Sequence, residues 1–93
     1  MTQVTITVVR SGGFAGLRRE WRVEGDAETW WPLVEACPWR AVPRDRDSRD
    51  RFVYSITARA DRRRRRAELP EAALTGPWKA LVERVQEERV QED

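Results

Sequence analysis

Residues 2–23 read TQVTITVVRSGGFAGLRREWRV, and this stretch decides the fold. Its first part, Thr2 to Arg10, is rich in β-branched residues and alternates apolar with polar side chains. Leu17 to Val23 has the same period of two, which is typical of a strand with one buried face. Between them, Ser11 to Gly16 contains three glycines that allow the backbone to turn. The stretch predicts a β-hairpin whose loop is longer than a two-residue turn.

A helix is predicted next, because the apolar residues between Trp30 and Cys37 recur at helical spacing. We expect it to begin near Thr29, so that Pro32 falls in the first turn, where its missing N–H does no harm. Pro38 is expected to end it. Trp30 would then face the sheet, together with Trp21 of the hairpin.

Two further strands and a second helix are predicted after a charged connection at residues 40–51. The strands span residues 52–58 and 64–69, and the helix runs from Pro77 to about Gln91, with Trp78 on its apolar stripe. The order is therefore ββαββα. It predicts an α+β fold with a four-stranded, mostly antiparallel sheet and both helices packed on one face of it. All 93 residues are expected to form one domain, with a frayed tail at residues 91–93.

The composition argues against most enzyme chemistry. There is no histidine, and Cys37 is the only cysteine, so no Ser-His or Cys-His nucleophile and no cysteine-histidine metal site is available. We expect no catalytic residue, no metal and no cofactor, and we interpret the chain as a binding protein. Its beginning lacks the basic and apolar regions of a signal peptide, and no stretch has the length of a membrane span. We therefore expect a cytoplasmic protein without membrane contact.

Phe14 is the unusual residue of the hairpin loop. A large apolar side chain among glycines at the tip of a solvent-facing loop is the kind of residue that anchors a binding surface. The alternative is that Phe14 folds back over the edge of the sheet.

The segment from Val8 to Leu17, with its Arg-Ser-Gly-Gly-Phe-Ala-Gly-Leu string, resembles the beginning of the emfourin family. The aspartate- and arginine-rich connection before Phe52 and the segment Ala67-Glu-Leu-Pro70 follow the same family pattern. Emfourins are small cytoplasmic bacterial inhibitors of thermolysin-like zinc metalloproteases. The resemblance implies that the hairpin loop occludes the substrate cleft of such a protease, and that the chain is a monomer when free. The residues assigned to this protease-binding loop are Arg10, Ser11, Gly12, Gly13, Phe14, Ala15, Gly16 and Leu17.

Within that reading, Phe14 or Leu17 would fill the pocket that these enzymes have for a bulky apolar side chain after the scissile bond. Arg10 and Ser11 would donate hydrogen bonds to acidic groups and carbonyls of the cleft. A second contact is expected from the aromatic flank of the first helix and from the charged connection. Its candidate residues are Trp31, Trp39, Asp45, Asp47 and Asp50.

Two other functions stay open at this point. The run Arg62 to Arg66 suggests phosphate contacts in a nucleic-acid-binding module, with exposed tryptophans stacking on bases. Against it, successive strand residues alternate between faces, so half of these arginines point away from any one surface. The other alternative is an assembly partner that uses Trp31 and Trp39, whose burial the sequence leaves undecided.

Overall fold

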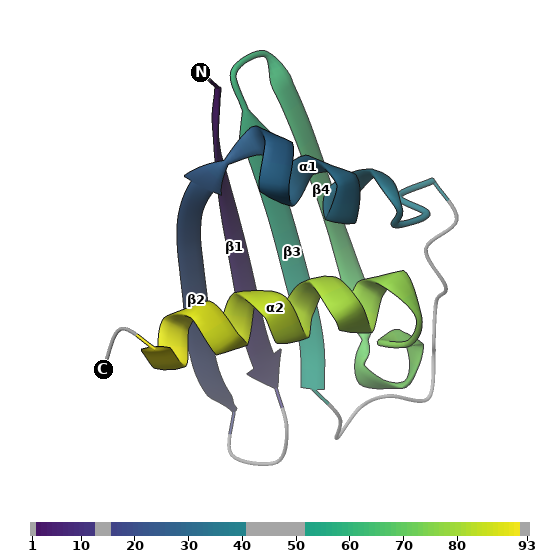
Figure 1. Cartoon of the computed structure of the whole chain (residues 1–93). Coiled ribbons are helices and arrows are strands. Elements are labelled where there is room, and N and C mark those ends of the chain that lie inside the picture. Colours follow the sequence, from purple (N-terminus) through teal and green to yellow (C-terminus); the bar gives the residue numbers. More distant parts are fainter. Residues whose placement is uncertain (1, 13–15, 41–51, 92–93) are drawn as a thin grey trace.

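The fold is built on a single antiparallel sheet (Figure 1). It is seen in a computed structural model that describes residues 2–12, 16–40 and 52–91. Four strands pair in the order β2-β1-β3-β4. Their bounds are β1 Gln3–Gly12, β2 Leu17–Asp26, β3 Phe52–Ala60 and β4 Arg63–Pro70. The predicted hairpin is therefore confirmed as β1 and β2. β1 begins one residue later than predicted, at Gln3, and ends two residues later, at Gly12, whereas the other three strands extend slightly beyond their predicted ranges.

Two helices lie across one face of this sheet (Figure 1). They are α1, Ala27–Glu35, and α2, Pro77–Gln91, with a short 3-10 turn, η1, at Glu71–Ala73. The element order is ββαββα, so the predicted α+β class and the helices on one face are confirmed.

The core fills the space between the sheet and the helices. Trp21, Trp30 and Trp78, which the sequence assigned to the interior, are all buried. The alternating residues of β1 meet the apolar stripe of α2, whose members Leu81, Val82 and Val85 are almost completely buried. The remaining large buried side chains of the core are Val4, Ile6, Val8, Val23, Trp31, Val34, Tyr54, Ile56 and Leu69.

The start of α1 differs from the prediction. The helix begins at Ala27 rather than near Thr29, because Asp26 caps it: the Asp26 carboxylate accepts a hydrogen bond from the backbone N–H of Glu28 at 3.2 Å. The Ala27 N–H also donates to the Thr2 carbonyl, which ties the helix start to β1. As a result Pro32 lies inside the helix rather than in its first turn.

The other face of the sheet is not covered by any described element (Figure 1). On β2 this face presents Arg18, Glu20, Arg22 and Glu24, which are all exposed. Small polar side chains such as Thr7 and Ser55 lie toward its centre on β1 and β3 and are half-buried. Alternation along the strands therefore separates an apolar face from a charged and hydroxyl-bearing one.

Candidate functional site

The hairpin end of the sheet carries the predicted protease-binding loop. Gly12 and Gly16, which flank it, have φ values of 103° and 64°. Both lie in the left-handed half of backbone space, which favours glycine, so the sequence places glycine where the chain needs it. Gly13, Phe14 and Ala15 lie outside the described residues.

Three strands meet at the base of this loop. Gly12 pairs with Leu17 across the hairpin and with Phe52 of β3 on its other side. The end of β1 is therefore held from both sides, up to the residue where the loop begins. Phe52, the first residue of β3, therefore lies beside the last residue of β1.

Arg10 and Ser11 lie on opposite faces of β1, because successive strand residues alternate. The guanidinium of Arg10 lies on the helix-bearing face, 4.6 Å from the ring centre of Phe52 and 5.7 Å from that of Trp21. Ser11 is half-buried on the uncovered face, opposite Arg18 and Val53. The structure thus does not bring Arg10 and Ser11 together on one surface.

Arg19 is a residue that sequence reasoning missed. It is the direct cross-strand partner of Arg10, and its guanidinium lies 5.0 Å from the centre of the Trp21 ring. The available signal was its alternation with Trp21 on β2, which places both side chains on the same face. What the sequence did not show is the register that sets Arg19 opposite Arg10.

Trp31 and Trp39, the candidates for a second contact, are packed into the domain. Trp31 is only 7% exposed; its indole N–H donates to the Glu35 carboxylate, and Arg63 lies over its ring at 5.3 Å. Trp39 is half-buried, contacts Trp78 edge-on with ring centres 4.7 Å apart, and donates its indole N–H to the Val34 carbonyl. The exposed aromatic surface required for base stacking is therefore not formed by Trp31. The other residues proposed for this contact, Asp45, Asp47 and Asp50, lie outside the described residues.

The arginine run divides between the two faces of β4, as alternation predicts. Arg64 and Arg66 share the face of Glu68, with which Arg66 forms an exposed ion pair at 3.9 Å. Arg63 lies on the other face, over Trp31. No single surface therefore gathers the whole run.

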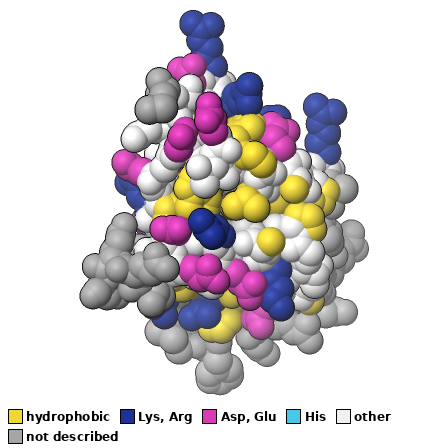
Figure 2. All heavy atoms as spheres, viewed as in Figure 1, with side chains coloured by type: hydrophobic (Ala, Val, Ile, Leu, Met, Phe, Trp, Pro, Cys, Tyr) yellow, Lys and Arg dark blue, Asp and Glu magenta, His cyan; other side chains and the backbone are white. Residues whose placement is uncertain are grey.

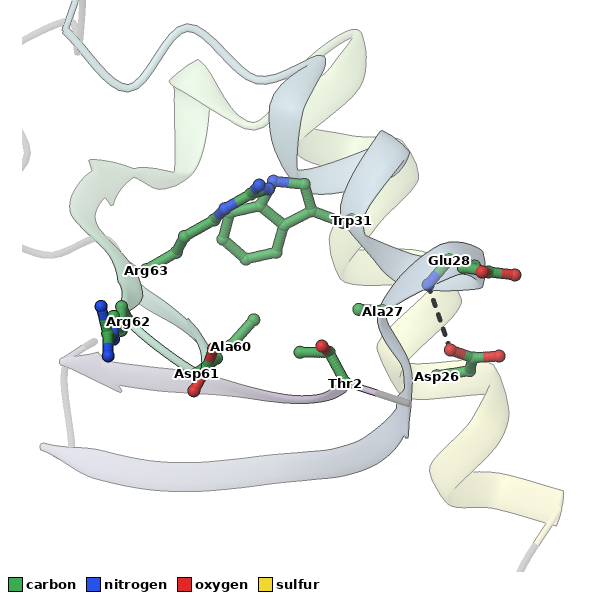
Figure 3. A pocket seen from close by; sticks show the side chains of 9 residues that line it. All are labelled: Thr2, Asp26, Ala27, Glu28, Trp31, Ala60, Asp61, Arg62 and Arg63. Atoms are coloured by element: carbon green, nitrogen blue, oxygen red, sulfur yellow. Dashed lines mark hydrogen bonds between the residues drawn. The ribbon is translucent and has the colours of Figure 1, made fainter.

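A pocket of about 450 Å³ opens at the far end of the sheet from the hairpin loop. Figure 3 shows Ala27 and Ala60 lining it, with Trp31 and Arg63 stacked along one side. Two of its charged side chains have structural roles, because Asp26 caps α1 and Arg63 lies over the Trp31 ring. This pocket does not contain any residue of the predicted loop.

Cys37 is inert as a nucleophile at neutral pH. The thiol is 4% exposed and donates to the Leu33 carbonyl at 3.5 Å, and burial raises its pKa to about 11. Across residues 2–12, 16–40 and 52–91, histidine, cysteine and carboxylate side chains do not gather into a group that would hold a metal ion. Within the same part of the chain, no helix has the length and apolar character needed to cross a membrane.

Charges of both signs are interspersed over the helix-bearing face, with hydrophobic side chains gathered near its centre (Figure 2).

The model of the Emfourin family matches residues 8–86, which include the second half of β1, all of β2, α1, β3 and β4, and most of α2. No curated protein and no solved structure matches the chain.

Proposed function

This chain belongs to the Emfourin family of metalloprotease inhibitors, and we propose that it blocks the substrate cleft of a thermolysin-like zinc protease with its hairpin loop. The proposed inhibitory segment spans Ser11 to Leu17: Ser11 and Gly12 end β1, and Leu17 begins β2. The match covers the whole hairpin except the first half of β1.

One structural observation supports the loop as the inhibitory element. Its base is fixed on three strands, because Gly12 pairs with both Leu17 and Phe52. A loop with a fixed base loses less conformational entropy on binding than a free peptide does, so more of the contact energy appears as affinity.

The proposed mechanism is steric occlusion rather than capture of the zinc ion. Zinc in proteins is bound by histidine, cysteine thiolate or carboxylate side chains. The chain has no histidine, and its one thiol is buried on α1's side of the core and protonated at neutral pH. The loop segment from Ser11 to Leu17 contains no carboxylate either.

Phe14 and Leu17 are the proposed pocket-filling residues. They are the two large apolar side chains of the loop, and thermolysin-like enzymes favour such a side chain just after the scissile bond. Replacing a buried anchor of an interface by alanine commonly costs 2 kcal/mol or more, or roughly thirtyfold in affinity.

The test is a progress curve of a thermolysin-like protease with a fluorogenic peptide and increasing amounts of this protein. We expect stoichiometric, substrate-competitive loss of activity, and at least a thirtyfold weaker inhibition by the double variant Phe14→Ala/Leu17→Ala. Arg64→Ala, an exposed change on β4 away from the loop, serves as the control and should inhibit like the wild type. Full inhibition by the double variant would exclude the loop as the inhibitory element.

We further propose that the protein acts in the cytoplasm and is a monomer when free. Sedimentation velocity at micromolar concentration would show a single species near 10.9 kDa, and a species of twice that mass would contradict the monomer.

A further inference from the structure

We propose that Arg10 and Arg19 form a carboxylate-binding pair, which contacts an acidic side chain at the rim of the target's substrate cleft. This inference rests on the proposed function and assigns a partner chemistry to the surface beside the loop. Its partner is an aspartate or glutamate of the protease.

The two arginines are held on one aromatic platform. They are direct cross-strand partners in β1 and β2, and both guanidiniums lie within 6 Å of the centre of the Trp21 ring. Arg10 also lies over Phe52, at 4.6 Å. Trp21 is 5% exposed, so the platform is part of the rigid core. Such cation–π contacts fix the position of side chains that are otherwise mobile.

Arg10 and Arg19 are like charges that stand directly opposite one another in the sheet, as Arg59 and Arg64 do on β3 and β4. Like charges directly opposite one another in an antiparallel pair are unfavourable. The other arginines of β2, Arg18 and Arg22, each form an ion pair with a glutamate two residues further along the same strand. Arg66 on β4 does the same with Glu68.

Arg10 and Arg19 have no glutamate two residues further along their own strands. The residue two positions after Arg19 is Trp21, and the residue two positions after Arg10 is Gly12. Among the described residues, neither arginine forms an ion pair. The sequence thus places an aromatic ring or a glycine where the neighbouring arginines have a carboxylate, so neither charge of the pair is neutralised by the residue two positions further along its own strand.

The geometry suits a carboxylate. Ring contacts engage the face of a guanidinium, whereas its N–H donors lie in the guanidinium plane and remain available to accept a planar anion. Arg10 is two residues from Gly12, where the loop begins. A loop inserted into a cleft would therefore bring the pair against the cleft's rim rather than its floor.

The test compares two adjacent residues of β2 that lie on opposite faces. Arg19→Gln removes a charge from the pair, and Arg18→Gln removes one from the uncovered face; both side chains are exposed, so both variants should fold. We expect Arg19→Gln to weaken inhibition about tenfold, as for loss of a desolvated charge pair, and Arg18→Gln to change it less than twofold. Arg19→Lys, which keeps the charge but not the planar group, should fall between the wild type and Arg19→Gln.

A salt titration supplies the second readout. Raising the salt from about 50 to 500 mM should weaken inhibition by the wild type more than inhibition by Arg19→Gln, because screening acts on the charge that the variant lacks. Equal inhibition by the wild type, Arg18→Gln and Arg19→Gln, with equal salt dependence, would overturn the pair while leaving the inhibitor function intact. If the wild type itself does not inhibit, the proposed function fails and the pair fails with it.

Discussion

Gly25 lies directly against the indole ring of Trp30, so that a β-carbon added at Gly25 would come within 2.7 Å of Trp30 Cδ1. Gly25 is the last residue but one of β2, and Trp30 is buried in α1. The glycine therefore permits the close approach of the helix to the strand that precedes it. Its role is set by packing, because its φ is not among the positive values.

Gly25→Ala should destabilise the protein by roughly 1–3 kcal/mol, since the Trp30 ring would have to move within a packed core. Urea unfolding followed by tryptophan fluorescence measures the change in the free energy of unfolding. Glu24→Ala, at the exposed neighbouring position, is the control and should change it by less than about 0.5 kcal/mol. An unchanged midpoint for Gly25→Ala would mean that the ring is not fixed against this strand.

Pro32→Ala should stabilise the protein. Pro32 is exposed inside α1 and cannot donate the hydrogen bond that an N–H at this position would give to the Glu28 carbonyl. Alanine restores the N–H donor, which stabilises the helix. It also gives the unfolded chain more conformational entropy, which opposes folding, but the first effect is larger, so the free energy of unfolding should rise by about 1–2 kcal/mol.

Pro77→Ala is the matched control for Pro32→Ala. Pro77 is the first residue of α2, a position where the N–H has no partner within the helix. Thermal unfolding should show a higher Tm for Pro32→Ala and no gain for Pro77→Ala. A lower Tm for Pro32→Ala would contradict the assignment of Pro32 to the helix interior.

Gly16 and Gly76 separate the loop's effect on inhibition from an effect on stability. Both have a positive φ, 64° and 57°, and a β-carbon at either would meet open space. Gly16→Ala and Gly76→Ala should therefore each cost about 1 kcal/mol of stability from backbone strain alone. Only Gly16→Ala should also weaken inhibition, because Gly16 flanks the hairpin loop and Gly76 precedes α2. Equal inhibition by the two variants would show that the backbone conformation at Gly16 does not contribute to inhibition.

The buried thiol of Cys37 should make the folded protein less stable at high pH. Burial raises the pKa of its thiol from 9.0 to about 11 in the folded protein. Between pH 9 and 11 the unfolded chain releases this proton while the folded chain keeps it, so stability falls as the pH rises through this window and is unaffected below it. Between pH 9 and pH 11, deprotonation of the thiol in the unfolded chain should lower the free energy of unfolding by about 2 kcal/mol.

The measurement is the free energy of unfolding at pH 8 and at pH 11 for the wild type and Cys37→Ala. The alanine variant loses packing equally at both pH values, so a smaller fall between them isolates the thiol. Falls of the same size in the two proteins would show that the thiol's pKa is not raised.

The sequence by itself determined the secondary structure and the separation of faces. The period of two in residues 2–10 and 17–23 places Val4 and Trp21 on the buried face without reference to any neighbour, because side chains of a strand alternate. The stripe of α2 around Leu81 is set in the same way by the helical repeat. The predicted start of α1 was wrong because it was placed so that Pro32 would fall in the first turn. The helix instead begins after Asp26, whose carboxylate caps it through a hydrogen bond from the Glu28 N–H.

Only the tertiary structure decided which residues meet. The strand order β2-β1-β3-β4 places Phe52, far along the chain, beside Gly12, and this pairing brings its ring under Arg10. The register of the hairpin sets Arg19 opposite Arg10, and the packing of the helices buries Trp31. Local periodicity determines the direction in which a side chain points. Strand register and helix packing depend on contacts between segments that are distant in the sequence, and they determine which residues that side chain contacts.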